Sequence, residues 1–300
     1  MLTRLFIRYV CTFVLVISAI SVDAEEIKLQ HKGVTLNAML ELASGKKVTD
    51  GVVLITHGAL AHRDMESITY IRKLFRDRGY NTMAINLSLG LNDRHGMYDC
   101  KVTHQHRNDD AVEEIGVWMD WLKHQGVKQV TLVGHSRGGA QTALYAVEHD
   151  NEMVKSVVLL APATGDNTNA AAYQNRYNKP LAPLLEKAKI LLNHRQGGTV
   201  LEHVGLLMCR DTPVTADSFV SYYGQDRRLD APYLMPKIRK PLLVIVAGND
   251  NIVVDLDKKV SPLVDGKRIN MEVIEGADHL FRDLYADDAV DAIHDFLTEG

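Results

Sequence analysis

Apolar residues along the chain form short continuous runs that are separated by stretches of helical period. Residues 51–58 (GVVLITHG) and 240–248 (KPLLVIVAG) are apolar almost throughout, which is typical of parallel strands covered on both faces. Between them, the stretches at about 109–123 and 138–148 repeat their apolar residues with the period of a helix. This alternation predicts an α/β fold with a mostly parallel central sheet and helices on both faces.

The start of the sheet has a different pattern. Residues 25–43 alternate apolar and polar side chains on either side of His31-Lys32-Gly33. Alternation of this kind predicts a half-buried hairpin, so the sheet should begin with antiparallel strands.

One connection is longer than the fold needs. Roughly 75 residues separate the strand that ends near Pro162 from the one that starts near Lys240, whereas a plain crossover needs about 30. The excess predicts a small helical cap, inserted at about 165–235 in a single domain over 25–300. Most of its apolar side chains should pack onto the core. These are Leu206, Leu207, Met208, Tyr222 and Tyr223.

The composition is that of a globular protein and argues against binding of nucleic acid. Apolar residues make up 46% of the chain, charged residues 24%, and the formal net charge is -4, all ordinary for a globular protein. No basic patch or zinc-finger spacing is present, so we expect no nucleic-acid partner.

The first residues have the pattern of a secretory signal peptide. Arg4 and Arg8 precede an apolar stretch, and Val22 and Ala24 occupy the -3 and -1 positions of a cleavage site after Ala24. We therefore expect residues 1–24 to be removed from a periplasmic or secreted protein that keeps no stable membrane span. An uncleaved N-terminal anchor is the alternative, although the apolar stretch is short for a bilayer.

Export bears on the cysteines. Only Cys100 and Cys209 follow the signal segment, and an oxidising compartment favours a disulfide between them. The alternative is a metal site, because the loop at 95–106 gathers residue types that suit zinc or copper. They are His95, Asp99, Cys100, His104 and His106. Their spacing matches no standard site, so we expect no metal.

The segment 130–139 (VTLVGHSRGG) contains the candidate nucleophile. Gly134-His135-Ser136-Arg137-Gly138 fits the G-x-S-x-G pattern, in which a serine lies on a sharp turn between a strand and a helix. Bulky side chains at Gly134 or Gly138 would collide in so tight a turn. An ordinary turn serine is the alternative.

A serine hydroxyl needs a base and the base needs an acceptor. Asp250 follows the strand LLVIVA and His279 follows the strand MEVI, so both should meet Ser136 at the carboxyl edge of the sheet. Asp166, after the preceding strand, is the competing acid.

The order Ser, Asp, His resembles that of the α/β-hydrolase superfamily. The resemblance rests on GHSRGG, on AGND before Asp250, on GADH ending in His279 and on THGAL after the early strand, and it covers nearly the whole chain after residue 24. It implies a serine hydrolase without cofactor, in which Ser136 attacks, His279 moves the proton and Asp250 orients His279. The backbone N–H groups of Ala59 and Arg137 would form the oxyanion hole.

The resemblance leaves the substrate open. A serine nucleophile points to acyl transfer to water from a carboxylic ester, a thioester or, less readily, an amide. The expected function is a carboxylesterase-like hydrolase, and the apolar cap residues favour small, uncharged esters. The alternatives are a peptidase or acyltransferase with the same triad, or a non-catalytic envelope protein that binds ligands on a hydrolase scaffold.

Overall fold

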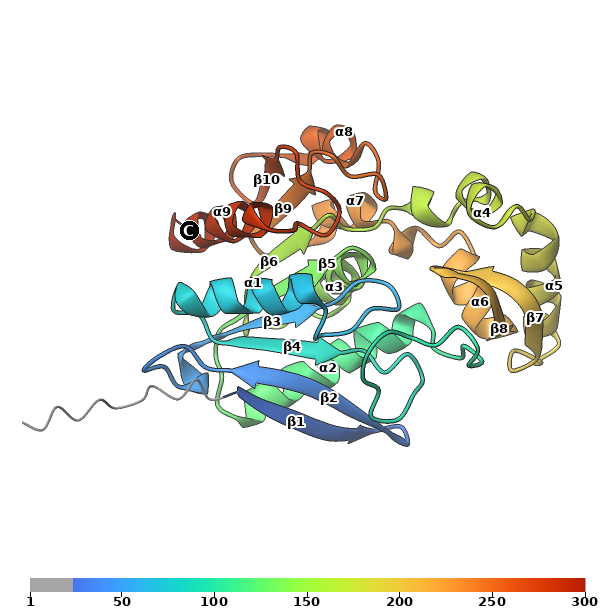
Figure 1. Ribbon diagram of the computed structural model, residues 1–300, viewed down its shortest axis with the longest axis horizontal. Helices are drawn as coiled ribbons and strands as arrows, with labels where there is room; N and C mark the ends of the chain where they lie inside the picture. The colour runs from blue at the N-terminus through green and yellow to red at the C-terminus, as the bar shows by residue number, and fades with distance from the viewer. Residues whose placement is uncertain (1–23, 300) are drawn as a thin grey trace, which may run out of the picture.

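The fold is built on an eight-stranded sheet in the order β1-β2-β4-β3-β5-β6-β9-β10 (Figure 1). The computed structural model describes residues 24–299, so the predicted signal peptide lies outside the described residues except for Ala24. The strands are β1 (Ala24–His31), β2 (Val34–Glu41), β3 (Val52–Thr56), β4 (Thr82–Asn86), β5 (Val130–His135), β6 (Val154–Leu160), β9 (Leu242–Ala247) and β10 (Ile269–Ile274).

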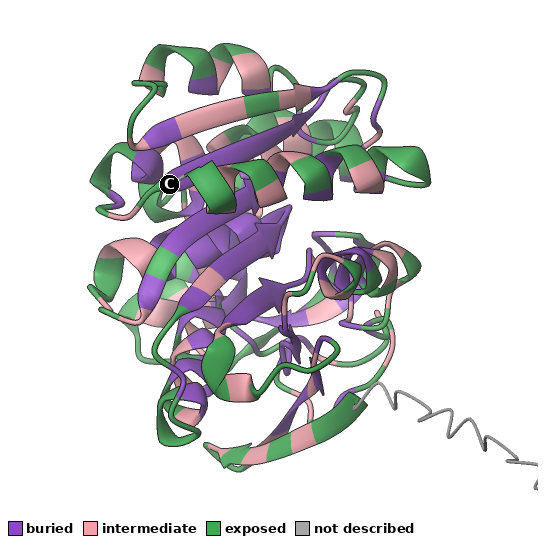
Figure 2. Ribbon diagram, turned by 90° about the vertical axis from the view of Figure 1, so that its left-hand side faces the viewer, coloured by how far each residue is buried: buried purple, intermediate pink, exposed green. Residues whose placement is uncertain are grey.

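Strand direction follows the sequence pattern. β1 pairs antiparallel with β2, and β2 pairs antiparallel with β4, which confirms the hairpin predicted at the start of the sheet. From β4 to β10 all the pairs are parallel. The strands with continuous apolar runs are buried along their whole length, as Figure 2 shows for the middle of the sheet.

Helices cover both faces of the sheet, as predicted. On one face α1 (Glu66–Asp77) and α9 (Leu284–Glu299) share an apolar cluster. On the other face lie α2 (Asn108–His124) and α3 (Arg137–Glu148), and their core includes the fully buried Trp118. Within residues 24–299 no helix combines the length and apolarity needed to cross a membrane.

The long connection between β6 and β9 forms the cap. It contains the helices α4 (Ala170–Tyr177), α5 (Leu181–Asn193), α6 (Ala216–Tyr223) and α7 (Ala231–Leu234), and the strands β7 (Val200–Leu206) and β8 (Cys209–Thr215). Besides the predicted helices, the cap contains the hairpin β7–β8, which was not predicted from the sequence (Figure 1). Its apolar alternation is broken by two register shifts, so the sequence shows no regular strand period there.

The cap apolar residues lie mostly inside. Leu206, Leu207, Tyr222 and Tyr223 are buried as predicted, while Met208 is 64% exposed at the tip of the hairpin. The cap is therefore a packed unit rather than an open apolar surface.

A disulfide joins the cap to the core. Cys100, in the loop after β4, is bonded to Cys209 of β8, with a Cα–Cα distance of 5.5 Å. This confirms the predicted pairing. The same loop adds two backbone hydrogen bonds, from His104 N–H to Pro213 O at 2.9 Å and from Thr215 N–H to His104 O at 3.0 Å. These bonds tie the loop after β4 to β8 of the cap.

Candidate active site

Ser136 lies on the turn between β5 and α3. Its backbone has φ 56° and ψ -122°, a conformation that costs energy for a residue with a side chain and recurs at functional turns. A Cβ on Gly134 would lie 2.6 Å from Gly138 O, and one on Gly138 would lie 2.7 Å from Thr56 O. Both glycines are required sterically, as the motif predicts, because only they allow the strand and the helix to approach so closely.

Three residues far apart in the sequence form one hydrogen-bonded line. His279 Nε2 lies 2.8 Å from Ser136 Oγ, and His279 Nδ1 lies 2.7 Å from Asp250 Oδ2. Asp250 follows β9, and His279 follows β10. The parallel strands end at one edge of the sheet, so these side chains meet there.

The surroundings keep Asp250 charged. Its other oxygen, Oδ1, accepts hydrogen bonds from the backbone N–H groups of Ile252 at 2.7 Å and Val253 at 2.9 Å. Burial acts to raise the pKa of Asp250, but the hydrogen bonds from His279 and from these N–H groups prevail and lower it. An ionised Asp250 accepts a hydrogen bond from His279 Nδ1–H, which leaves Nε2 free to accept a hydrogen bond from Ser136.

The competing acid lies elsewhere. Asp166 has a side chain that is 67% exposed, and it forms an ion pair with Lys259 rather than a contact with His279. The structure therefore places Asp250, and not Asp166, against the imidazole.

Two further histidines support the turn. His135 Nε2 lies 2.8 Å from the backbone oxygen of His279, and burial together with the nearby His279 lowers the pKa of His135 to about 4, so the ring is neutral and donates this hydrogen bond. Burial and the charge of Arg94 lower the pKa of His57 to about 3. His57 Nδ1 then donates to Gly58 O at 2.8 Å, and Nε2 accepts from Leu87 N–H at 3.1 Å.

These contacts fix the loop that carries Ala59. Gly58 lies so close to the turn that a Cβ on it would be 3.2 Å from Ser136 Cβ. Arg137 is the first residue of α3, where a helix has N–H groups without intrahelical acceptors. The two backbone N–H groups expected to form an oxyanion hole thus belong to segments that flank Ser136.

The loop considered as a metal site has other contacts. Cys100 is in the disulfide, His104 Nδ1 lies 2.9 Å from Ser218 Oγ, and His106 Nδ1 lies 3.1 Å from Tyr222 Oη. His95 instead bonds Glu26 across the edge of the sheet. Over residues 24–299 no three His, Cys, Asp or Glu side chains are grouped so that they could hold a metal ion.

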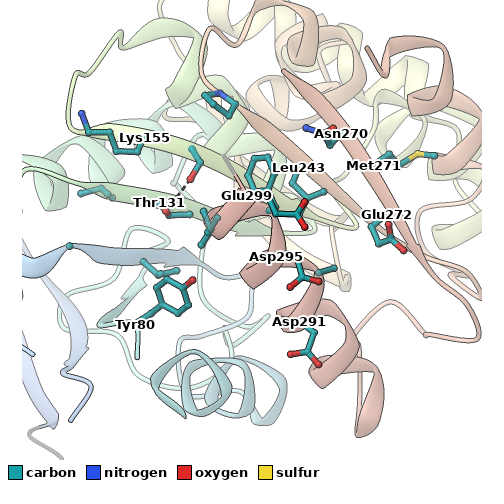
Figure 3. Close-up of a pocket in the computed structure, with 18 of the residues that line it drawn as sticks. Tyr80, Thr131, Lys155, Leu243, Asn270, Met271, Glu272, Asp291, Asp295 and Glu299 are labelled. Atoms are coloured by element: carbon teal, nitrogen blue, oxygen red, sulfur yellow. Dashed lines mark hydrogen bonds between the residues drawn. The ribbon is translucent and has the colours of Figure 1, made fainter. Parts of the chain in front are cut away.

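A hollow of about 1380 Å³ lies at the opposite edge of the sheet, where the strands begin (Figure 3). Its lining mixes both charges, with Lys155 on one side and Asp291, Asp295 and Glu299 on the other. Ser136 and His279 are not among its lining residues. Ligands of parallel sheets bind at the carboxyl ends of the strands, so this hollow is separate from the candidate site.

The side chain of Arg137 is not among the groups predicted from the sequence, which include only its backbone N–H. This side chain is 4% exposed, and its Nε and Nη1 have no hydrogen-bond partner among the described residues. The sequence does contain a sign of this buried charge, because Arg137 stands between a strand and a helix that are both buried.

Comparisons with known proteins agree with this architecture. A family model described as the α/β-hydrolase fold matches residues 51–196. Among solved structures, Est1E from Butyrivibrio proteoclasticus is 17% identical, with a TM-score of 0.61 over 91% of this chain and 98% of its own. A monoacylglycerol lipase from Paleococcus ferrophilus is 16% identical, with a TM-score of 0.60 over 88% and 99%. The esterase domain of a Rhodothermus marinus protein is 17% identical, with a TM-score of 0.56 over 91% and 96%.

Proposed function

Because the chain belongs to the α/β-hydrolase superfamily, we propose that it is an exported serine hydrolase that cleaves a carboxylic ester or thioester through an acyl-enzyme on Ser136. The observation that carries this proposal is the line of hydrogen bonds from Asp250 through His279 to Ser136 Oγ. The similarity to an esterase domain and to a lipase supports ester substrates.

In the first half of the reaction Ser136 Oγ forms a bond to the acyl carbon, and its proton passes to His279 Nε2. Asp250 stabilises the imidazolium through Nδ1–H. His279 then gives the proton to the leaving alcohol or thiol as its bond to the acyl carbon breaks. In the second half, water attacks the acyl carbon and gives its proton to His279. That proton returns to Ser136 as the acid leaves.

Negative charge develops on the carbonyl oxygen in both halves. The N–H groups of Ala59 and Arg137 are the proposed donors to it. The N–H of Ala59 lies in the loop that His57 holds in place. The N–H of Arg137 is the first of α3, and the helix dipole gives that end of the helix a partial positive charge. Because His57 and the glycines fix these segments before substrate arrives, the donors need no reorganisation in the transition state.

The proposed location is the periplasm or the exterior of the cell. Two observations support it: the signal-peptide pattern of residues 1–24, and the disulfide between Cys100 and Cys209, a bond that is rare in reducing compartments. Alkylation of the protein purified without reductant tests the disulfide, because paired cysteines are not alkylated. Mass spectrometry of the N-terminus of the same protein tests cleavage after Ala24.

Labelling with a fluorophosphonate probe tests the reaction. Ser136 Oγ should displace fluoride from the probe, and Ser136→Ala should abolish both labelling and ester hydrolysis with a loss of about 10⁶ in kcat. Ser156→Ala is the matched control, because Ser156 is a buried serine on β6 whose hydroxyl is hydrogen-bonded to Thr131, away from His279. It should label like the wild type.

The outcomes separate the alternatives. Unlabelled wild-type protein with no turnover of any ester would indicate a non-catalytic binding protein. Faster cleavage of aminoacyl-anilides than of esters would indicate a peptidase, and transfer of the acyl group to an added alcohol in preference to water would indicate an acyltransferase.

A further inference from the structure

The side chain of Arg137 is a buried cation without an anion. The residue is 4% exposed, and Nε and Nη1 are both buried without an acceptor among residues 24–299. Burial lowers the pKa of Arg137, yet a guanidinium stays protonated at any physiological pH. A positive charge therefore lies beside Ser136 inside the protein.

The titratable groups that act most strongly on Arg137 come from the cap, and none of them carries a negative charge at neutral pH. They are Tyr222 and Tyr223 of α6, and Arg176 and Tyr177 of α4. The tyrosine hydroxyls already have partners. Tyr177 Oη lies 3.0 Å from Tyr223 Oη, and Tyr222 Oη lies 3.1 Å from His106 Nδ1. Arg176 adds a second positive charge on the cap side.

Among residues 24–299, each of the other buried arginines has an anion or a hydrogen-bond acceptor beside it, although Nε and Nη1 of Arg72 and Nη1 of Arg63 also lack a hydrogen bond. Arg63 pairs with Glu26 at 2.5 Å, and Arg72 lies 3.5 Å from Glu41. Arg94 donates to the backbone oxygens of neighbouring loop residues and to a buried asparagine. An unpaired buried charge is strongly unfavourable, so the exception at Arg137 calls for a partner that arrives from outside.

The position of the guanidinium indicates what that partner is. Arg137 directly follows Ser136, and the titratable groups that act on it most strongly belong to the cap helices α4 and α6. We infer that its guanidinium lies on the cap side of Ser136, within reach of an ester bound there. A guanidinium presents a planar fork of N–H donors that matches the two oxygens of a carboxylate. We propose that Arg137 binds a carboxylate of the substrate, so that this enzyme hydrolyses esters that carry a free carboxylate group.

This inference rests on the proposed function and changes its substrate class. The expectation of uncharged esters came from apolar cap residues such as Leu206, Leu207, Tyr222 and Tyr223, and these are buried in the packing of the cap. The group beside Ser136 that lacks a partner is a cation.

Matched pairs of esters test the inference. Monoethyl adipate and ethyl hexanoate differ by a carboxylate on the acyl side, and 4-acetoxybenzoate and its methyl ester differ by one on the leaving-group side. We expect kcat/KM to be about ten- to a hundredfold higher for the charged member of one pair, as expected for a charge-assisted hydrogen bond. The pair that shows the preference identifies the side of the ester that faces Arg137.

Variants assign the preference to this side chain. Arg137→Met should bring the charged-to-neutral ratio close to one, and Arg137→Lys should retain part of it, because an ammonium keeps the charge but not the fork. The ratio is the readout because any change at the Arg137 backbone N–H affects both esters of a pair alike. Arg239→Met is the control, since it removes one exposed positive charge that pairs with Asp150. It should keep the wild-type ratio.

A measurement on the wild type alone makes the test independent of how the variants fold. Adipate should slow fluorophosphonate labelling of Ser136 at concentrations at which the neutral adipamide does not. Equal kcat/KM within both ester pairs, or a preference that survives in Arg137→Met, would overturn the role of Arg137 while labelled Ser136 still supports a serine hydrolase. Failure of labelling would instead overturn the proposed function itself.

Discussion

Asp250→Asn is the sharpest test of how the site works, because the structure leaves the amide two orientations and both are unfavourable. In the first, the amide oxygen accepts from His279 Nδ1–H, and the NH₂ group faces the N–H groups of Ile252 and Val253. Two hydrogen bonds of 2.7 and 2.9 Å are then replaced by donor–donor contacts. The cost is about 1–3 kcal/mol for the N–H of the buried Val253 left without an acceptor, and less for that of the exposed Ile252.

In the second orientation the amide oxygen keeps both backbone hydrogen bonds and the NH₂ group faces His279. A donor at 2.7 Å from Nδ1 requires that nitrogen to be unprotonated, so the proton moves to Nε2 and the imidazole no longer accepts from Ser136. This orientation preserves more hydrogen bonds and should prevail. We expect kcat to fall by about 10⁴, the loss that a wrong tautomer causes in such triads, with little change in thermal stability.

The assay is hydrolysis of an ester that the wild type turns over, with Asp166→Asn as the matched control. Asp166 is an exposed carboxylate in an ion pair with Lys259, and such pairs contribute about 0–1 kcal/mol to stability. Asp166→Asn should therefore keep nearly the wild-type kcat. If Asp166→Asn lost more activity than Asp250→Asn, the assignment of the acid and the tautomer argument would both be refuted.

Two further predictions concern the frame of the site. Replacing Cys100 and Cys209 by serine should lower the free energy of unfolding by up to about 4 kcal/mol in urea titrations, because the bond closes a loop with a sequence separation of 109; an unchanged midpoint would contradict this. Gly138→Ala should lower kcat strongly, because the added methyl group would meet the backbone oxygens of residues 56 and 57 and displace the loop that carries Ala59. Gly198→Ala, where the methyl group meets nothing within 4 Å, is its control, and equal activity of the two variants would count against the steric argument.

The parallel sheet made most of the site predictable. Once the apolar runs are recognised as parallel strands, residues after their carboxyl ends must share an edge, whatever their separation in the sequence. This is why Ser136, Asp250 and His279 could be brought together without coordinates. The helices were also well defined by their period, and α2 begins and ends within a residue or two of the predicted 109–123.

The cap was less predictable because its elements are short and its strands irregular. The hairpin β7–β8 has a broken period, and no local pattern reveals that its Cys209 lies next to the loop at Cys100. The sequence alone could not decide between Asp166 and Asp250 as the acid, since both follow strands of the same sheet. The unpaired state of Arg137 depends on which cap side chains surround it, which sequence spacing does not encode.

The energetics of Arg137 distinguish a functional cation from a structural one. If the guanidinium held the cap in place, Arg137→Met would lower both stability and activity. If it awaits a substrate carboxylate, the free protein bears the cost of two buried donor nitrogens, Nε and Nη1, without acceptors, at about 1–3 kcal/mol each. Methionine covers similar apolar surface without that cost, so Arg137→Met should raise the free energy of unfolding while it removes the preference for charged esters.

Urea denaturation of the variant beside the wild type measures the first effect. A stability loss together with an unchanged charged-to-neutral ratio would show that Arg137 serves the packing of the cap and not the recognition of the substrate.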